Sequence, residues 1–243
     1  MSLEIDSCLA QKKVIRAYEF RRKLEGPKLW QLRALALERG GMPSTVQKIL
    51  RRISYASPET VRILDIGCGR GFKNDLIVKS LVTPSAKSIM IEGCDLLEQP
   101  DPVLPSDARA SFSFRRLPAE NILETFGPES FDVVTGIAMH HHLGNLVDVA
   151  AQVNAVLVPG GIHLIADNFC WQGNALASAL SRSWIQVYRW CEGNGFYNEA
   201  TCDDVLHAQR NAGLEIVGTF RAPLFVEGII ARKISQPAHE LTT

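Results

Sequence analysis

The chain has 243 residues, of which 46% are hydrophobic and 21% are charged, with 26 basic and 26 acidic side chains. This length suits one large α/β domain, and the zero net charge offers no surplus positive field for a nucleic-acid backbone. None of the six cysteines forms a C-x-x-C pair, so we expect reduced thiols and neither a disulfide framework nor a metal site. No apolar run is long enough for a membrane helix and no secretory signal is visible at the N-terminus, which together favour a cytoplasmic protein.

The first sixty residues read as helices. Apolar and basic positions mix over residues 8–24, and leucines at helical spacing follow until Gly40 and Gly41 end the second helix. Ser44 begins a Ser-Thr-Val-Gln sequence that is typical of a capping box, which predicts a third helix from that residue. We expect residues 1–60 to be a helical extension or lid on an α/β domain that covers residues 61–243.

Strands and helices then alternate along the chain. The pattern predicts five strands, at residues 61–66, 88–94, 110–115, 131–135 and 161–166, and helices at residues 72–82 and 146–157. Three prolines between residues 99 and 110 favour a loop there. Because strands joined through helices pair in parallel, the ligand of such a sheet is expected at the carboxyl ends of the strands.

The C-terminal part differs from the rest. A helix is expected at residues 202–211, followed by strands at 214–220 and 226–233 that are separated by only five residues. A gap this short excludes a crossover, so these two strands must be antiparallel. The predicted fold is therefore α/β and doubly wound, with a mostly parallel seven-stranded sheet, a C-terminal antiparallel hairpin, N-terminal helices, and a helical insertion at about residues 168–200.

A glycine-rich turn follows the first predicted strand. Its sequence, Gly67-Cys68-Gly69-Arg70-Gly71, has the spacing G-x-G-x-G, and Phe72 stands where a dinucleotide fingerprint requires glycine. The turn therefore favours a ligand that carries no phosphate at that point. Asp95 ends the second strand, where its carboxylate could accept both hydrogen bonds of a ribose diol, although a helix cap or a turn is the alternative role.

With these features the chain resembles the class I S-adenosylmethionine-dependent methyltransferases from residue 61 to about residue 233. The resemblance is carried, in order, by Asp65–Gly71, Gly93–Asp95, Ala119–Asn121, Phe131–Val134, His141–Leu143 and Val158–Gly161. It implies S-adenosylmethionine as the cofactor and methyl transfer to a small molecule. Pro118 is a departure, because many members of the family have an acidic residue there for the adenine amino group.

The resemblance also implies roles for single residues. The methionine and ribose parts of the cofactor would lie against the first turn, and the other parts would meet the ends of later strands. The implied cofactor-binding residues are Asp65, Gly67, Cys68, Gly69 and Gly71 in the turn, Asp95 for the ribose hydroxyls, Leu96, Ala119 and Glu120 around the adenine, and Gly136 and Ile137 beside the methionine moiety.

Candidate catalytic and substrate residues follow the fourth and fifth strands. His141 and His142 belong to a run of three histidines where the methyl group should point, and either could act as a general base, with capping or packing as the alternative role. Asp167 and Asn168 end strand five at the same edge and are candidate substrate contacts. Aromatic residues of the predicted insertion and of the first helix could cover an apolar substrate, with packing in a helical layer as the alternative. Three of them are candidate substrate contacts: Tyr18, Trp171 and Tyr188.

We therefore predict an enzyme that transfers a methyl group to a small apolar or aromatic metabolite by in-line displacement, a reaction for which positioning is the main requirement. Its only expected partner is a small molecule, without nucleic acid or membrane, and the protein is expected to be a monomer or a homodimer. Two alternatives remain open. One is an enzyme that breaks another bond of the same cofactor, by transfer of the aminobutyrate arm, cyclisation or release of methylthioadenosine; the other is a non-catalytic regulator that binds the cofactor.

Overall fold

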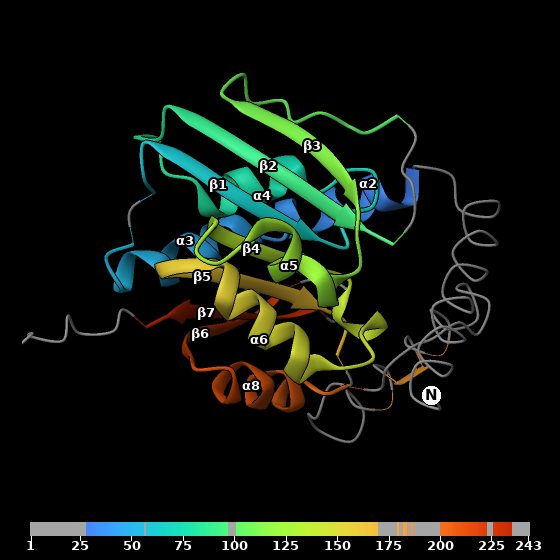
Figure 1. Ribbon diagram of the computed structural model, residues 1–243. Coiled ribbons are helices and arrows are strands. Elements are labelled where there is room, and N and C mark those ends of the chain that lie inside the picture. The colour runs from blue at the N-terminus through green and yellow to red at the C-terminus, as the bar shows by residue number, and fades with distance from the viewer. Residues whose placement is uncertain are drawn as a thin grey trace, which may run out of the picture.

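A computed structural model of the chain describes residues 28–55, 57–96, 101–169, 200–222 and 226–234, together with Ala179, Arg182, Ser183 and Gln186. Seven strands form one sheet in the order β3-β2-β1-β4-β5-β7-β6 (Figure 1). The strands are β1 Thr60–Ile66, β2 Ser88–Asp95, β3 Ala110–Arg116, β4 Phe131–Ile137, β5 Leu157–Asp167, β6 Leu214–Ala222 and β7 Val226–Lys233.

The pairing of the strands confirms the predicted fold class. Strands β1 to β5 pair in parallel, and β7 runs antiparallel to both β5 and β6. Six strands therefore point the same way and only β7 is reversed. The strand order changes direction between β1 and β4, which is the place where an open α/β sheet binds its ligand.

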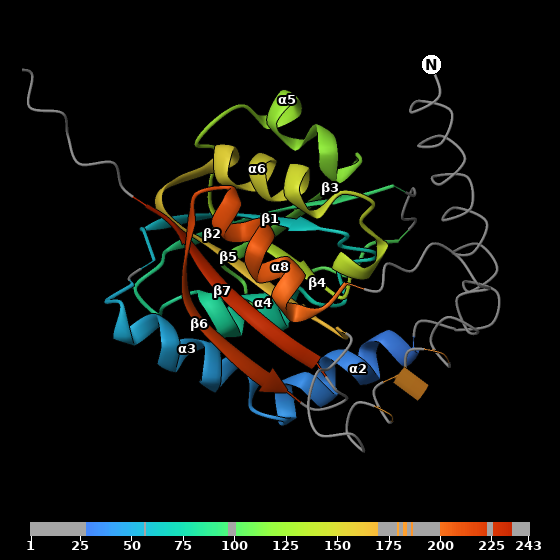
Figure 2. The same ribbon diagram turned by 90° about the horizontal axis from the view of Figure 1, so that it is seen from below.

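Helices cover both faces of the sheet (Figure 2). One layer contains α2 Lys28–Arg39, α3 Met42–Arg52 and α4 Asn74–Leu81, and the other contains α5 Ile122–Phe126, α6 Leu146–Val156 and α8 Cys202–Asn211. Because helices lie on both sides, the central strands β1 and β4 are buried along almost their whole length. In the described part of the chain, no helix has the length and hydropathy needed to cross a bilayer.

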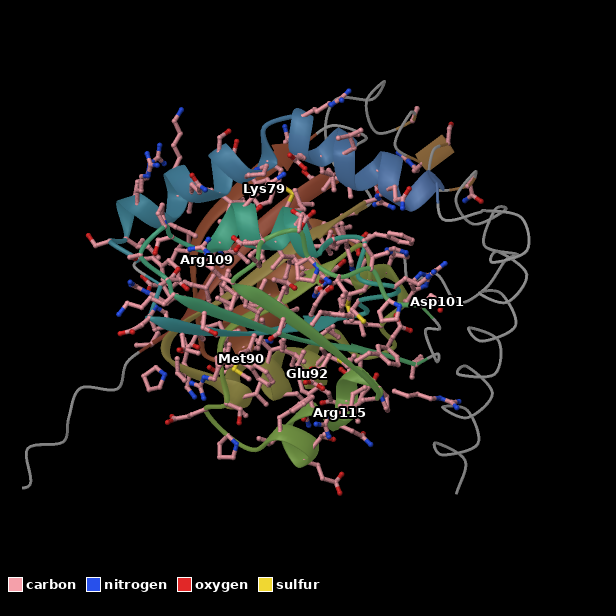
Figure 3. The ribbon with its side chains drawn as sticks, turned by 90° about the horizontal axis from the view of Figure 1, so that it is seen from above. Lys79, Met90, Glu92, Asp101, Arg109 and Arg115 are labelled. Carbon is pink, nitrogen blue, oxygen red and sulfur yellow. The ribbon has the colours of Figure 1, made fainter. Side chains whose placement is uncertain are left out.

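The helices α2 and α3 pack on α4 rather than on the sheet alone. Lys79 of α4, labelled in Figure 3, forms an ion pair with Glu38 of α2 at 2.7 Å. The main-chain oxygen of Lys79 also accepts a hydrogen bond from the Gln47 side chain of α3 at 2.6 Å. These contacts fix the N-terminal helices beside the first crossover of the sheet. The division into an extension at residues 1–60 and a domain at 61–243 stays a prediction.

The edge of the sheet at β2 and β3 is less covered. Met90 is 52% exposed, and Glu92 forms an ion pair with Arg115 at 2.9 Å on the neighbouring strand (Figure 3). Alternate residues of β3 are exposed, as expected for an edge strand with one solvated face. This edge lies on the side of β2 away from the switch between β1 and β4.

Two boundary predictions were wrong. Helix α3 does not begin at Ser44: its N-cap is Gly41, which has a left-handed φ of 83°, and the Ser44 hydroxyl donates to the Gly41 carbonyl at 2.8 Å. Glycine adopts this conformation without strain and Pro43 suits a first helical turn, so the helix starts before the serine.

The fifth strand is longer than predicted. It runs over Leu157–Asp167, and its register with β4 shifts between Phe131 and Val133. The segment Pro159-Gly160-Gly161 therefore lies inside the strand as a bulge and is not a turn in front of it. The predicted helix at residues 8–24 lies outside the described residues, as does most of the predicted insertion at 168–200.

Candidate functional site

The glycine turn after β1 has the backbone that its sequence requires. Gly67, Gly69 and Gly71 have φ values of 65°, 54° and 81°, in the left-handed region that L side chains rarely adopt. A Cβ on Gly67 would lie 2.6 Å from the Cβ of Met139, so a side chain has no room there. The N–H groups of Gly67 and Cys68 donate to the Cys94 carbonyl at 2.8 and 3.1 Å, which ties the turn to the end of β2.

Asp95 lies directly beside this turn. Its Oδ2 accepts a hydrogen bond from the Gly69 N–H at 3.0 Å, and its main-chain oxygen accepts one from the Leu117 N–H at 2.9 Å. The second bond brings the short 3-10 helix η1, Ala119–Asn121, to the end of β2, with Ala119 buried and Glu120 exposed. A half-buried carboxylate next to a turn of bare backbone fits a nucleoside ligand that has no phosphate at this point.

Asp65 is fully buried beneath the turn. Its Oδ1 accepts a hydrogen bond from the Thr135 hydroxyl of β4 at 2.7 Å, and its Oδ2 lies 3.8 Å from the ammonium of Lys73. Burial raises the pKa of this carboxyl, and the Lys73 charge and the Thr135 hydrogen bond act in the opposite direction. The carboxylate thus links β1 to β4 and faces Lys73 below the turn.

Burial also affects the two neighbouring thiols, Cys68 and Cys94. It raises the pKa of Cys68 and of Cys94 far above neutral pH, and the charges of Asp65 and Asp95 raise both further. These thiols therefore stay protonated and are poor nucleophiles. Cys68 contributes its main chain to the turn.

Lys73 was missed in the sequence. Its ammonium donates to the carbonyl of Gly67 at 2.9 Å and to the carbonyl of Ile137 at 2.7 Å, so it bridges the ends of β1 and β4. The signal that could have revealed it is a lysine in front of the buried helix α4, directly after the glycine motif. Gly136 precedes Ile137, and a Cβ on it would lie 2.4 Å from the His140 ring.

The loop before β3 is anchored to the same turn. The Arg70 guanidinium donates to the main-chain carbonyl of Asp101 at 2.9 Å (Figure 3). The Val103 N–H donates to the Arg70 carbonyl at 2.7 Å. The Asn74 side chain donates to the Val103 carbonyl at 3.1 Å. These residues were also missed, and they hold the proline-containing loop, predicted as such, against the glycine turn.

A buried histidine–carboxylate pair lies at the ends of β4 and β5. His141 belongs to the 3-10 helix η2, His140–His142, and its Nδ1 lies 2.7 Å from Oδ1 of Asp167, the last residue of β5. The His141 main-chain N–H also reaches Oδ2 of Asp167 at 3.2 Å. Both side chains are almost fully buried. The structure thus brings together two residues that the sequence had proposed separately, one for catalysis and one for substrate contact.

The charge state of Asp167 fixes the roles of the two ring nitrogens. Burial raises the pKa of this carboxyl, but the His141 charge and hydrogen bond outweigh burial and hold the pKa well below its usual range. An ionised carboxylate only accepts hydrogen bonds, so Nδ1 of His141 must be the donor. In the neutral ring, Nε2 then carries the lone pair that can accept a proton.

Helix α2 contributes a residue to this region. Arg33 of α2 is buried, and its guanidinium donates to the side-chain oxygen of Asn168, which follows Asp167. The Asn168 N–H in turn donates to Oδ1 of Asp167 at 2.7 Å. No pattern in the sequence pointed to Arg33, because a lone arginine on an amphipathic helix is usually solvated.

The structure describes some of the other candidate site residues, and others lie outside the described part of the chain. His142 is half-buried, and its ring centroid lies 4.0 Å from that of His141. Leu96 follows Asp95 and accepts a hydrogen bond at its main-chain oxygen from the Arg116 side chain, and Glu120 is an exposed residue of η1. Tyr18, Trp171 and Tyr188 lie outside the described residues. No cluster of metal-ligating side chains occurs in the part of the chain that the structure describes.

The pKa values of two further buried histidines predict how the stability of the folded protein depends on pH. Burial lowers the pKa of His140 to about 4 and that of His163, which is bonded to Gln209 at 2.8 Å, to about 3. The folded state therefore binds fewer protons than the unfolded chain, whose histidines titrate near 6.5, and stability is lost as the pH falls below that value. The expected loss between pH 7 and pH 5 is about 1–2 kcal/mol for each histidine.

Urea unfolding at both pH values tests this, with His163→Gln as the variant. The raised pKa of Asp65 acts in the opposite sense but is common to both proteins, so the difference between them isolates His163. The variant should lose less stability on acidification, whereas His207→Gln, at an exposed position, should behave as the wild type. Identical pH dependence in the wild type and His163→Gln would contradict the prediction.

Known proteins resemble the central part of this chain in sequence. Residues 64–163 match the family model described as "Methyltransferase domain". The ubiquinone biosynthesis O-methyltransferase of Agrobacterium fabrum is 31% identical over 137 residues, which cover 54% of this chain and 50% of that protein. The enzyme of the same name from Pseudomonas syringae pv. tomato is 28% identical over 103 residues, 41% of each chain. The chain thus spans half or less of the length of these curated relatives.

Solved structures resemble the chain over a longer stretch. The 1,6-didemethyltoxoflavin-N1-methyltransferase of Burkholderia thailandensis, solved with 1,6-didemethyltoxoflavin and S-adenosylhomocysteine, superposes with a TM-score of 0.57 at 16% identity. The alignment covers 96% of this chain and 90% of that one, and at this identity it shows a shared fold. The match to the methyltransferase-domain model, the strand order of the sheet and the glycine turn after β1 all indicate the same fold. Residues 64–163 therefore form a methyltransferase domain, and the chain has the fold of the S-adenosylmethionine-dependent methyltransferases that it superposes on.

Proposed function

We propose that this chain transfers a methyl group from S-adenosylmethionine to an oxygen atom of a small metabolite, with His141 as the general base. The observation that carries the proposal is the buried pair of His141 and Asp167, 2.7 Å apart, which lies at the carboxyl ends of β4 and β5. A hydroxyl nucleophile starts protonated and gains from a base, whereas methyl transfer to an unprotonated atom does not need one. The curated relatives matched by this chain are O-methyltransferases, which supports an oxygen acceptor.

The cofactor would be held by the residues that the structure gathers around β1. The backbone of Gly67–Gly71 would lie against its methionine and ribose parts, and Asp95 would accept from the ribose hydroxyls. The ends of β2 and η1, with Leu96, Ala119 and Glu120, would border the adenine. When bound, S-adenosylmethionine supplies a methyl group on a sulfonium, which is activated for in-line displacement.

His141 and Asp167 would act together to remove the proton of the acceptor hydroxyl. The Asp167 carboxylate accepts from Nδ1 of His141, so Nε2 is the atom that takes the hydroxyl proton. As the ring becomes positively charged, the adjacent carboxylate stabilises that charge, and burial makes the attraction stronger than it would be in water. The Arg33–Asn168 contact holds the backbone next to Asp167 and places α2 at the edge of this region.

A small apolar or aromatic metabolite is the substrate we infer, and the neutral net charge favours such a molecule over nucleic acid. The aromatic residues proposed to cover it, Trp171 and Tyr188, belong to the insertion expected at about 168–200.

Mass spectrometry of the products tests the proposal. The purified chain is incubated with S-adenosylmethionine, with and without a metabolite extract that contains hydroxylated aromatics. We expect S-adenosylhomocysteine to accumulate only with the extract, together with a product heavier by one methylene unit. Methylthioadenosine as the product would instead select an enzyme that breaks another bond of the cofactor. Tight binding without any turnover would select a regulator.

A further inference from the structure

Lys73 places a positive charge where the ends of the two central strands meet. Its side chain is 11% exposed, and its ammonium lies 2.9 Å from the Gly67 oxygen and 2.7 Å from the Ile137 oxygen. The buried carboxylate of Asp65 lies 3.8 Å away. Two carbonyl oxygens and one carboxylate around a single ammonium make a site for a cation, and the protein fills that site with its own side chain.

The position of this site matters for the cofactor. Gly67 directly follows β1 and Ile137 ends β4, and both belong to the segments against which the resemblance places the methionine part of the cofactor. That part carries an α-ammonium, which has the same charge and the same three donors as the ammonium of lysine. Two ammonium groups that both bonded to these oxygens would lie close together, and like charges repel each other strongly in a buried site.

We infer that Lys73 is a specificity-determining residue that cancels the contribution of the cofactor's α-ammonium to binding, an inference that rests on the proposed function. If the α-ammonium enters the site, the ammonium of Lys73 has to leave, and the exchange of one ammonium for another brings no net gain. If Lys73 stays, the α-ammonium remains outside the site. In both cases this chain binds a nucleoside thioether about equally well with or without an α-ammonium.

A thermodynamic cycle measured by calorimetry tests the inference. The two ligands are S-adenosylhomocysteine and its deaminated analogue, the adenosyl thioether of 4-mercaptobutyrate, and the two proteins are the wild type and Lys73→Met. The wild type should bind both ligands with dissociation constants within about threefold of each other. Lys73→Met should prefer S-adenosylhomocysteine by at least roughly tenfold, because a hydrogen bond to a charged group contributes at least about one power of ten to affinity.

Lys79→Met is the matched control. Lys79 lies on α4, the helix that Lys73 precedes, and its half-exposed side chain forms an ion pair with Glu38 of α2. This variant should bind the two ligands as the wild type does. A wild type that prefers S-adenosylhomocysteine by tenfold or more, or a preference that is the same in the wild type and in Lys73→Met, would overturn the inference.

The two affinities of the wild type test the inference even if the Lys73→Met variant does not fold. Removing Lys73 leaves Asp65 buried without its nearby cation, so Lys73→Met is expected to be less stable. If it does not fold, the two wild-type affinities still decide, since near equality supports the inference and a tenfold preference overturns it. A wild type that binds both ligands with such a preference refutes only the role of Lys73. A wild type that binds neither ligand refutes the proposed function together with the inference.

Discussion

Replacing Asp95 by alanine is expected to weaken the binding of S-adenosylhomocysteine by about 100-fold. The carboxylate ends β2 beside the glycine turn, held there by the Gly69 N–H at 3.0 Å. In the proposed complex it accepts hydrogen bonds from the ribose hydroxyls, and hydrogen bonds to a charged group contribute about 1.5–3 kcal/mol each. Asp95→Ala loses two such hydrogen bonds, and water partly replaces them at the ribose hydroxyls. The net loss corresponds to roughly two powers of ten in affinity.

Calorimetry on the purified proteins measures this effect. Glu92→Gln is the matched control, because Glu92 lies three residues earlier on β2 and its side chain forms an ion pair with Arg115 of β3. It should bind S-adenosylhomocysteine as the wild type does. An Asp95→Ala protein that is folded by circular dichroism and keeps its affinity within about threefold would show that Asp95 has only its structural bond to Gly69.

Replacing His141 by glutamine is expected to lower kcat by about 100- to 10,000-fold, the range found for removal of a general base. The affinity for S-adenosylhomocysteine should stay unchanged, because His141 lies at the ends of β4 and β5 with Asp167 as its partner, whereas the glycine turn follows β1. The substitution His141→Gln is therefore expected to slow methyl transfer without weakening cofactor binding. Initial rates with the identified acceptor, together with calorimetry, measure both quantities.

Two further substitutions give this prediction its controls. Asp167→Asn should lower kcat strongly as well, because an amide can donate to Nδ1 of His141 and leave the proton on Nε2, the wrong nitrogen for a base. His142→Gln removes the neighbouring ring, 4.0 Å away, and should change kcat by less than about tenfold if His141 is the base. A larger loss in His142→Gln than in His141→Gln would transfer the role of base to His142.

A rise of the rate with pH is expected from the same arrangement. The base is active only when the His141 ring is neutral, and the ionised Asp167 favours the protonated ring. In Asp167→Asn that stabilisation is absent, so the rate that remains should reach its plateau at a lower pH than in the wild type.

Much of the fold follows from local sequence patterns. The seven strands and their order along the chain are encoded by apolar runs separated by glycine, proline or a helix, and the short gap before β7 forces it to run antiparallel. Errors occurred at element ends, where a single residue decides. Gly41 rather than Ser44 begins α3, and the Gly160 bulge extends β5 beyond what hydrophobicity alone suggests.

The glycine turn and the carboxylate at position 95 can be predicted from local sequence, because both depend on spacing within one β-α-β unit. The charged side chains that meet across the sheet become visible only in the folded chain. The Lys73 ammonium reaches Ile137, Arg33 reaches Asn168, and His141 rather than His142 reaches Asp167. These pairs join residues that are 64, 135 and 26 positions apart in the chain. Local periodicity carries no information on such distances, whereas the parallel pairing of the strands brings their carboxyl ends to one edge of the sheet.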